Sequence, residues 1–301
     1  MYRRYRLRIV AMSVLAGLVS ACGVNAQGGS APVVASKTGH ISRIYPTPKG
    51  TEMASMPAPN GMMWVLAGNQ HVQALFPLEL THHTVGSGIA LNARTSLVGQ
   101  VASGPLFTMQ NGSTPQIVWR SATSGKRTGS LSLPGFAIAG MSGQTGHHLY
   151  FVCLTAAHRS EAVMVTTGSH LAVSGTWSVP STTVSLAPSP TGRHVYTLST
   201  TGQVTEWSTK SPHQMVSQFS IGQSGRSLVI NPAGTTLYVL KGRHHIRNIA
   251  VVSLSTESVS HVLAAPAYSR QIVMSPNGRA LYVVVGTAAY GNVQEITQLG
   301  G

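Results

Sequence analysis

A short pattern recurs along this chain, and its regular spacing restricts the fold more than any other feature. Each copy has an apolar run, a tight turn ending in glycine, and a second apolar run with a tyrosine four residues after that glycine. Proline presets the backbone for such a turn, and glycine accepts the positive φ that the turn needs. The glycines of the four best copies are Gly146, Gly192, Gly234 and Gly278, and their tyrosines are Tyr150, Tyr196, Tyr238 and Tyr282.

Two weaker copies extend the series towards the N-terminus. Gly61 and Gly104 are each followed three residues later by an aromatic residue, Trp64 and Phe107. Successive glycines of all six copies are then 42 to 46 residues apart. This spacing is typical of a β-propeller with one four-stranded blade per repeat. The sequence therefore predicts an all-β fold with a single propeller of about six blades, with seven as the alternative.

The two ends of the repeat region predict how the ring closes. The last copy supplies three strands, the third near residues 292–296, and the chain then stops. One strand-like stretch, His40–Tyr45, precedes the first copy. We expect it to complete the last blade as a fourth strand, because closure removes the free edges of an open sheet.

Over residues 39–301 the chain resembles the YVTN-type β-propeller repeat proteins of bacterial and archaeal surfaces. The resemblance is strongest over residues 143–285. The usual turn of that family is Ser-Pro-Asp-Gly, and here Thr191, Ala233 and Asn277 stand where the family has aspartate. Propellers of that family often have seven blades, whereas this chain provides six copies.

The N-terminus reads as an export signal. Arg3, Arg4, Arg6 and Arg8 precede an apolar run, and Leu18-Val19-Ser20-Ala21-Cys22 follows. This end resembles a bacterial lipobox, which implies a signal peptide at 1–21, a lipidated Cys22 and a membrane anchor facing the extracellular or periplasmic side. Residues 22–38 are then a flexible tether, and 39–301 the propeller. An ordinary signal peptide, an uncleaved anchor and twin-arginine export are the alternatives.

The charge balance is unusual. The formal charge is +14, with six acidic residues that are all glutamate, and removing the four leader arginines leaves +10. Carboxylates that stabilise a fold lose that role when acid protonates them, so a chain without aspartate suits an acidic exterior. Lineage bias in composition is the alternative. Because the basic residues are scattered outside the leader, we expect no nucleic-acid partner.

Catalytic and metal-binding signatures are weak, so we assign no catalytic residue, no metal and no cofactor. Glu161, Glu206 and Glu295 fall in or near third strands, away from a central channel, and a hard cation needs several oxygen anions. Adjacent histidines on a strand point to opposite faces, so the pairs at 82–83, 147–148 and 244–245 read as turn and edge residues. Cys153 lies in an apolar run and reads as a buried small hydrophobic residue.

The densest basic cluster outside the leader is the candidate binding site. It lies between the second and third strands of the fifth blade, and a second basic pair occupies the equivalent loop of the third blade. Such loops share one face of a propeller, so together they predict an anion-binding face, with a solvated loop as the alternative. The residues are Lys241, Arg243, His244, His245 and Arg247, with His158 and Arg159.

These features favour a non-enzymatic binding or scaffold module tethered to a membrane. Its expected partner is another envelope protein or an anionic polymer. The alternative is an exported hydrolase or lactonase of the propeller type. Because the propeller fold hosts many functions, the fold by itself does not choose between them.

Overall fold

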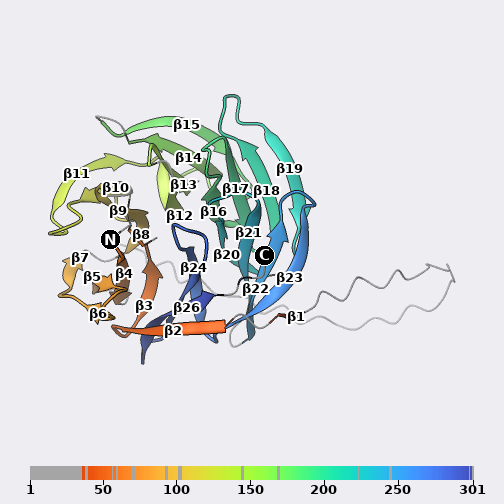
Figure 1. Cartoon of the computed structure of the whole chain (residues 1–301). Helices are drawn as coiled ribbons and strands as arrows, with labels where there is room; N and C mark the ends of the chain where they lie inside the picture. Colours follow the sequence, from red (N-terminus) through yellow and green to blue (C-terminus); the bar gives the residue numbers. More distant parts are fainter. Residues whose placement is uncertain are drawn as a thin grey trace, which may run out of the picture. The chain divides into compact units, whose positions relative to one another are not determined.

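The computed structural model describes residues 36–37, 40–55, 57–58, 60–68, 72–91, 94–100, 104–143, 146–167, 170–222, 224–243, 246–297 and 299. The elements assigned there are strands, and they form six sheets around a central axis (Figure 1). Each sheet is one blade, and its strands are called a to d from the axis outward. The predicted six-bladed propeller is confirmed.

The first three blades follow one another along the chain. The first has β3 (Thr51–Ala54), β4 (Met62–Gly68), β5 (Gln73–Glu79) and β6 (Thr84–Val85), with β7 (Ile89–Leu91) also paired to β5. The second has β8 (Thr95–Gln100), β9 (Leu106–Gln110), β10 (Gln116–Arg120) and β11 (Arg127–Ser132). The third has β12 (Gly135–Ser142), β13 (His148–Thr155), β14 (Ser160–Thr166) and β15 (Ala172–Ser178).

The remaining blades bring the two ends of the propeller together. The fourth has β16 (Thr183–Pro188), β17 (His194–Ser199), β18 (Gln203–Ser208) and β19 (Met215–Ser220). The fifth has β20 (Gly225–Ile230), β21 (Thr236–Arg243), β22 (Ile246–Ser253) and β23 (Ser258–Ala265). The sixth takes β24 (Ser269–Met274), β25 (Leu281–Gly286) and β26 (Gly291–Thr297) from the C-terminal end and β2 (His40–Thr47) from the N-terminal end.

The ring closes as the sequence predicts. Strand β2 pairs antiparallel with β26, from His40 opposite Thr297 to Thr47 opposite Gly291. The Tyr45 hydroxyl donates a 2.8 Å hydrogen bond to Glu295 across this pair. One further strand, β1 (Ser36–Lys37), pairs parallel with β23, so the segment assigned to the tether contributes two residues to the fifth blade.

The core lies between the blades. Six clusters of buried apolar side chains occur, one at each contact between neighbouring blades, including a cluster that joins Tyr45 and Tyr282 of the sixth blade to Met63 of the first. Strands covered on both faces must be apolar throughout, and all six residues of β25 are buried. The repeat tyrosines Tyr150, Tyr196, Tyr238 and Tyr282 are buried in these clusters.

The repeat glycines form the turns between the a and b strands. Gly278 has φ of 71°, and a Cβ there would lie 2.8 Å from Cδ of Pro232 in the turn of the preceding blade. Both the backbone conformation and this close approach require glycine. Gly61, Gly146, Gly192 and Gly234 also have positive φ, and Gly104 precedes strand β9 in the same way.

Each inner strand contains a β-bulge, where one residue has no partner on the b strand. Bulges of this kind redirect a side chain out of the regular alternation. One such bulge occurs in each blade, and in four of the six blades it is the second residue of the inner strand. The bulge residues are Glu52, Val98, Ile138, Val184, Arg226 and Arg270.

Candidate anion-binding site

The candidate site lies at the end of the ring that carries the b–c hairpins and the connections from each d strand to the next a strand. This end is called the b–c face, and the opposite end the a–b face. An open pocket of about 350 Å³ occurs there. It is lined by Val184, Thr200, Ser224, Gly225, Arg226, Gly242, Arg243 and Arg270.

The β-bulges of the inner strands place the arginines in this pocket. Val184, Arg226 and Arg270 are the bulge residues of the fourth, fifth and sixth blades, and all three line it. The b–c hairpin of the fifth blade adds Arg243 from the outside. Three arginines from three segments therefore line one pocket, and we call this the arginine pocket.

Hydrogen bonds to the backbone and side chains orient two of these arginines. Nε of Arg270 donates to the Gly286 carbonyl at 2.7 Å, and Nε of Arg243 donates to Oγ of Ser224 at 3.4 Å. Arg226 is exposed and makes no hydrogen bond to the part of the chain that the structure describes. Its guanidinium is free to contact a ligand.

Two further cations of the fifth blade lie beside the pocket. The Lys241 ammonium donates to the Ile221 carbonyl at 2.8 Å, and Arg247 donates to the Gly242 carbonyl. Burial lowers the pKa of Arg247, and the charge of Arg226 lowers it further. Arg226 and Arg247 are therefore close enough for their charges to interact.

In the part of the chain that the structure describes, no carboxylate forms an ion pair with these arginines. Within the described residues, the ion pairs are His82 with Glu79 and His194 with Glu206, and none involves a lysine or arginine. Guanidinium groups bind carboxylate, sulfate and phosphate oxygens through paired hydrogen bonds. The arrangement suits an anion with several oxygens.

The structure brings together part of the predicted face and adds to it. Arg243 lines the pocket, and Lys241 and Arg247 flank it. His158 and Arg159 lie in the b–c hairpin of the third blade, on the same face but outside the pocket lining, and His244 and His245 lie outside the described residues.

Sequence reasoning missed Arg226 and Arg270, although the repeat held a signal for them. Each stands eight residues before a repeat glycine, Gly234 and Gly278 respectively. Ile138 and Val184 hold the same position before Gly146 and Gly192. Residues at the same position of the repeat lie at the same place in each blade. Arginines at this position in two consecutive repeats therefore predict a cluster on one face of the propeller.

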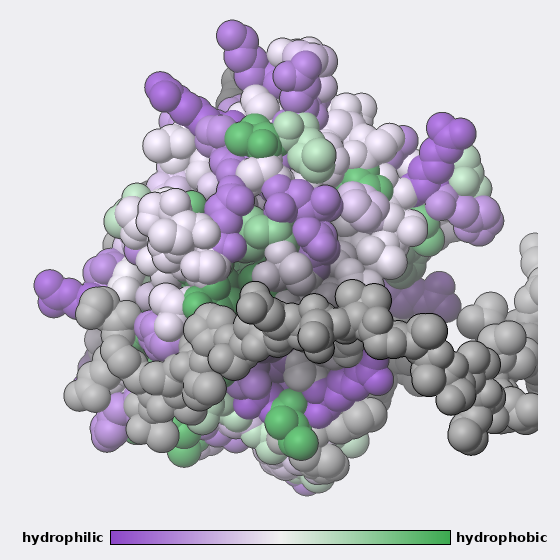
Figure 2. All heavy atoms as spheres, turned by 90° about the vertical axis from the view of Figure 1, so that its right-hand side faces the viewer, coloured by the Kyte–Doolittle hydropathy of each residue, from purple (hydrophilic) through white to green (hydrophobic). Residues whose placement is uncertain are grey.

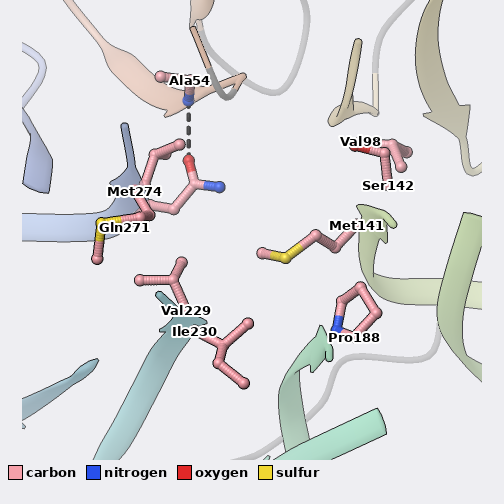
Figure 3. Close-up of a pocket in the computed structure, with 10 residues that line it drawn as sticks. Ala54, Val98, Met141, Ser142, Pro188, Val229, Ile230, Gln271 and Met274 are labelled. Carbon is pink, nitrogen blue, oxygen red and sulfur yellow. Dashed lines mark hydrogen bonds between the residues drawn. The ribbon is translucent and has the colours of Figure 1, made fainter. Parts of the chain in front are cut away.

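An apolar cavity lies between the inner strands, near their carboxyl ends (Figure 3). The cavity is about 50 Å³, and residues of all six inner strands line it. Met141 reaches into it and packs against the clusters of three blade contacts. The carboxamide oxygen of Gln271 accepts a 2.8 Å hydrogen bond from the Ala54 amide, which links the sixth blade to the first.

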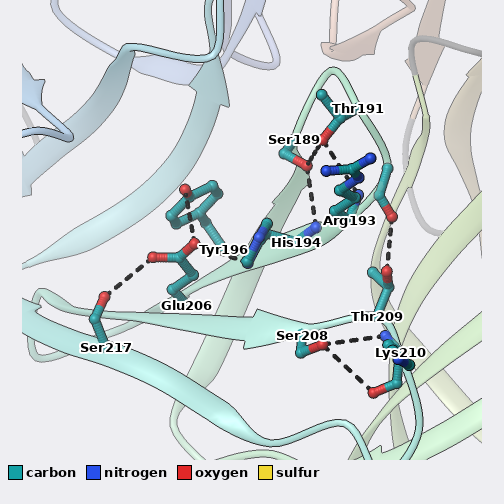
Figure 4. A network of polar contacts seen from close by, with 11 residues as sticks. Ser189, Thr191, Arg193, His194, Tyr196, Glu206, Ser208, Thr209, Lys210 and Ser217 are labelled. Atoms are coloured by element: carbon teal, nitrogen blue, oxygen red, sulfur yellow. Dashed lines mark hydrogen bonds and ion pairs between the residues drawn. The ribbon is translucent and has the colours of Figure 1, made fainter.

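Two acidic side chains in the third strands, Glu206 and Glu295, make contacts within their blades. Glu206 accepts hydrogen bonds from the Tyr196 hydroxyl at 3.2 Å and from Ser217 at 3.2 Å, and Nδ1 of His194 lies 2.9 Å away (Figure 4). These contacts tie strands β17, β18 and β19 together. Among the described residues no three His, Cys, Asp or Glu side chains gather as a metal site.

Histidine pairs and the cysteine lie at structural positions. His82 and His83 occupy a turn, where His82 contacts Glu79 at 2.8 Å and the His83 ring meets the Tyr45 ring edge-on. His147 and His148 lie where β13 begins. Cys153 is buried in β13, and burial raises the pKa of its thiol to about 12, so the thiol stays protonated. No helix in the described part of the chain has the length and hydropathy to cross a membrane.

Several solved structures share this fold at low identity. The luciferin-regenerating enzyme aligns with a TM-score of 0.64 at 12% identity, over 86% of this chain and 96% of that one. The β-propeller domain of Cps50 (Swd1) from Myceliophteria thermophila gives 0.58 at 10%, over 85% and 99%. Kuenenia stuttgartiensis hydrazine synthase gives 0.56 at 14%, over 78% and 73%.

These similarities concern the fold alone, since the identities are low and the named proteins differ in what they do. No protein-family model matches the chain, and no curated protein matches it. The structure and these similarities together show that the chain is a six-bladed β-propeller, and the structure places an arginine pocket on its b–c face.

Proposed function

We propose that this protein is an exported, lipid-anchored propeller that binds an anionic polymer on its b–c face and catalyses no reaction on it. The observation that carries the proposal is the convergence of Arg226, Arg243 and Arg270 in one pocket without an ion-paired carboxylate. Hydrogen bonds already orient the guanidinium groups of Arg270 and Arg243, so binding an anion has less side-chain freedom to remove, which favours affinity.

A polymer is favoured over a single small anion because the cations extend beyond the pocket. Lys241 and Arg247 flank it, and Arg159 lies on the same face in the third blade. A chain of repeated anions can contact several of these groups at once, and such multivalent contact raises affinity. The mostly apolar lining of the cavity between the inner strands further supports a binding role over hydrolysis.

The arginine pocket is tested by titrating the mature protein with inorganic polyphosphate. We expect binding that weakens when Arg226 or Arg270 is changed to glutamine, by about tenfold each, because a charge-assisted hydrogen bond contributes about 1.5 kcal/mol or more. Arg279→Gln is the matched control, because Arg279 is exposed in an a–b turn on the opposite face. Equal losses in all three variants, or no binding by the wild type, would contradict the proposal.

The anchoring part of the proposal concerns Cys22, which lies outside the described residues. It is supported by the lipobox-like end of the leader, and a flexible tether of the 13 residues between Cys22 and strand β1 would span roughly 20 Å. Expressed in a bacterium, the wild type should incorporate labelled palmitate and enter the detergent phase, and Cys22→Ala should do neither. Unlabelled wild-type protein in the membrane fraction would disprove lipidation while leaving the anion site untouched.

A further inference from the structure

A second pocket on the b–c face is lined almost entirely by neutral polar side chains. It is about 210 Å³, and eight of its nine lining residues are serine, threonine or glutamine. All four strands of the fourth blade contribute to it. The residues that matter most are Thr183 from β16, Thr197 and Ser199 from β17, Thr205 from β18 and Gln218 from β19.

Several of these polar side chains are deeply buried and held in fixed positions. Thr183, Thr197 and Thr205 are each 2% exposed. Oγ1 of Thr197 accepts a 2.9 Å hydrogen bond from Nε1 of Trp207, and Oγ1 of Thr205 accepts one of 3.1 Å from Gln218. Since a hydroxyl has two acceptor positions, each threonine keeps one for a ligand.

This pocket departs from the packing of its neighbours. Thr197 pairs with Thr205 across β17 and β18, whereas the matching pairs are Phe151 with Val163 in the third blade and Val239 with Ala250 in the fifth. Those side chains fill apolar clusters between blades. Burying hydroxyls costs free energy that their hydrogen bonds to Trp207 and Gln218 must offset, whereas apolar side chains at both positions would need no such partners.

The hydroxyl-lined pocket lies next to the arginine pocket along the chain. Val184 and Thr200 line the arginine pocket, whereas their neighbours Thr183, Ser199 and Thr201 line the hydroxyl-lined pocket. The two pockets are therefore adjacent at the start of β16 and at the hairpin that follows β17.

We propose that the hydroxyl-lined pocket binds a neutral polyhydroxylated unit, a sugar ring, of the anionic polymer, so that the ligand is an anionic polysaccharide. The inference rests on the proposed anion binding. Sugar hydroxyls both donate and accept, which matches threonine hydroxyls and glutamine amides. The volume is below the roughly 300–1,000 Å³ typical of pockets for drug-sized ligands, so it accommodates a single ring.

The test compares dextran sulfate, which carries sugars and anions, with polyphosphate, which carries only anions. Thr197→Val and Thr205→Val keep the side-chain shape and remove the hydroxyl. We expect each to weaken dextran sulfate binding about fivefold, the equivalent of one neutral hydrogen bond, and to leave polyphosphate binding unchanged. Thr108→Val is the matched control, because Thr108 is buried at the same repeat position of the second blade and donates to the Val118 carbonyl.

The fluorescence of Trp207 gives a second readout that requires no pocket variant. Because Trp207 donates to Thr197, a sugar in the pocket should change its emission, and Trp207→Phe should abolish that change. Dextran sulfate and concentrated uncharged dextran should produce it, and polyphosphate should not.

The outcomes separate the two proposals. The sugar site would be overturned by two results together, even if polyphosphate binds. These are an unchanged affinity for dextran sulfate in both valine variants and no Trp207 response to either dextran. Failure of both polyanions to bind would instead refute the proposed function, and a Trp207 response to uncharged dextran would still support the sugar site.

Discussion

At the scale of single residues, the buried tyrosines have the clearest chemical consequence. Burial and the neighbouring Glu295 carboxylate raise the pKa of Tyr45 to about 12, and burial raises the pKa of Tyr150 to about 12. Burial also raises the pKa of Tyr196, Tyr238 and Tyr282. In the unfolded chain these groups would ionise near pH 10. Between about pH 10 and 12, the folded protein therefore keeps these tyrosine hydroxyls neutral, whereas they ionise in the unfolded chain.

The tyrosines predict an alkaline limit to stability. Since the folded pKa lies above the unfolded value, their contribution is complete below about pH 10 and is lost as the pH rises towards 12. We expect cooperative unfolding in that range, with circular dichroism and tyrosinate absorbance changing together. Tyr45→Phe should lower the free energy of unfolding by about 1 kcal/mol at neutral pH, because the hydrogen bond to Glu295 is lost. Between neutral and high pH, the variant should lose less stability than the wild type. Tyrosinate absorbance that rises smoothly while the fold persists would contradict this.

At the scale of elements, one strand decides whether the ring is closed. Strand β2 comes from the N-terminal end and completes a blade made by the C-terminal end. It brings Tyr45 into the cluster between the sixth and first blades. Without it, β26 would expose a row of unpaired backbone groups, which promotes aggregation.

Deleting residues up to 48, so that the chain begins at Lys49, tests this closure. We expect aggregation or a large drop in the melting temperature, because the last blade loses a strand and its buried tyrosine. The milder variant Tyr45→Ala should cost about 3–5 kcal/mol, the typical cost of truncating a buried aromatic residue. A truncated protein that stays monomeric and melts as the full chain does would show that β2 is dispensable.

At the scale of the whole molecule, the surface relies little on carboxylates. Where the surface in Figure 2 is coloured, residues of intermediate hydropathy cover much of it, with hydrophilic side chains projecting and small apolar areas between them. The chain has six glutamates and no aspartate. The pKa of Glu79 is lowered by its hydrogen bond to His82, but this pair is exposed to solvent, so losing it in acid costs little.

Because few carboxylates stabilise the fold, we expect the protein to tolerate acid. Two effects act against this tolerance. His148, whose pKa is lowered by burial, must be charged as the pH falls, and the charge of residues 22–301 would approach +29 once 13 histidines join 16 lysines and arginines. Repulsion of this kind is screened beyond about 10 Å at 0.1 M salt. We expect the β-sheet signal to persist to about pH 3 at moderate salt and to weaken at low salt. Cooperative unfolding between about pH 4 and 5, in the range of ordinary glutamate titration, would show that a few glutamates hold the fold together.

The sequence predicted the architecture better than the site, for a physical reason. Turn glycines and buried tyrosines recur because every blade packs in the same way, so their spacing was sufficient to predict six blades and the closing strand. The arginine pocket depends on side chains that meet only once the ring is formed. Arg243 was found through its basic hairpin, whereas Arg226 and Arg270 are isolated in sequence and become neighbours through bulges in adjacent blades. Thr197 and Thr205 are ordinary strand residues until their blade is compared with the others.

The central claim is that anions bind in the arginine pocket, and the salt dependence of binding tests it most directly. The affinity for polyphosphate should be measured over a salt series for the wild type, for Arg226→Gln/Arg270→Gln and for the control Arg193→Gln/Arg279→Gln, which removes two charges from the a–b face. In a plot of the logarithm of affinity against the logarithm of salt concentration, the affinity falls as salt rises. The slope becomes steeper by about one for each ionic contact between protein and ligand. We predict a slope that is shallower by about two in the pocket variant and unchanged in the control. Equal slopes in the wild type and the pocket variant would show that the anion binds elsewhere.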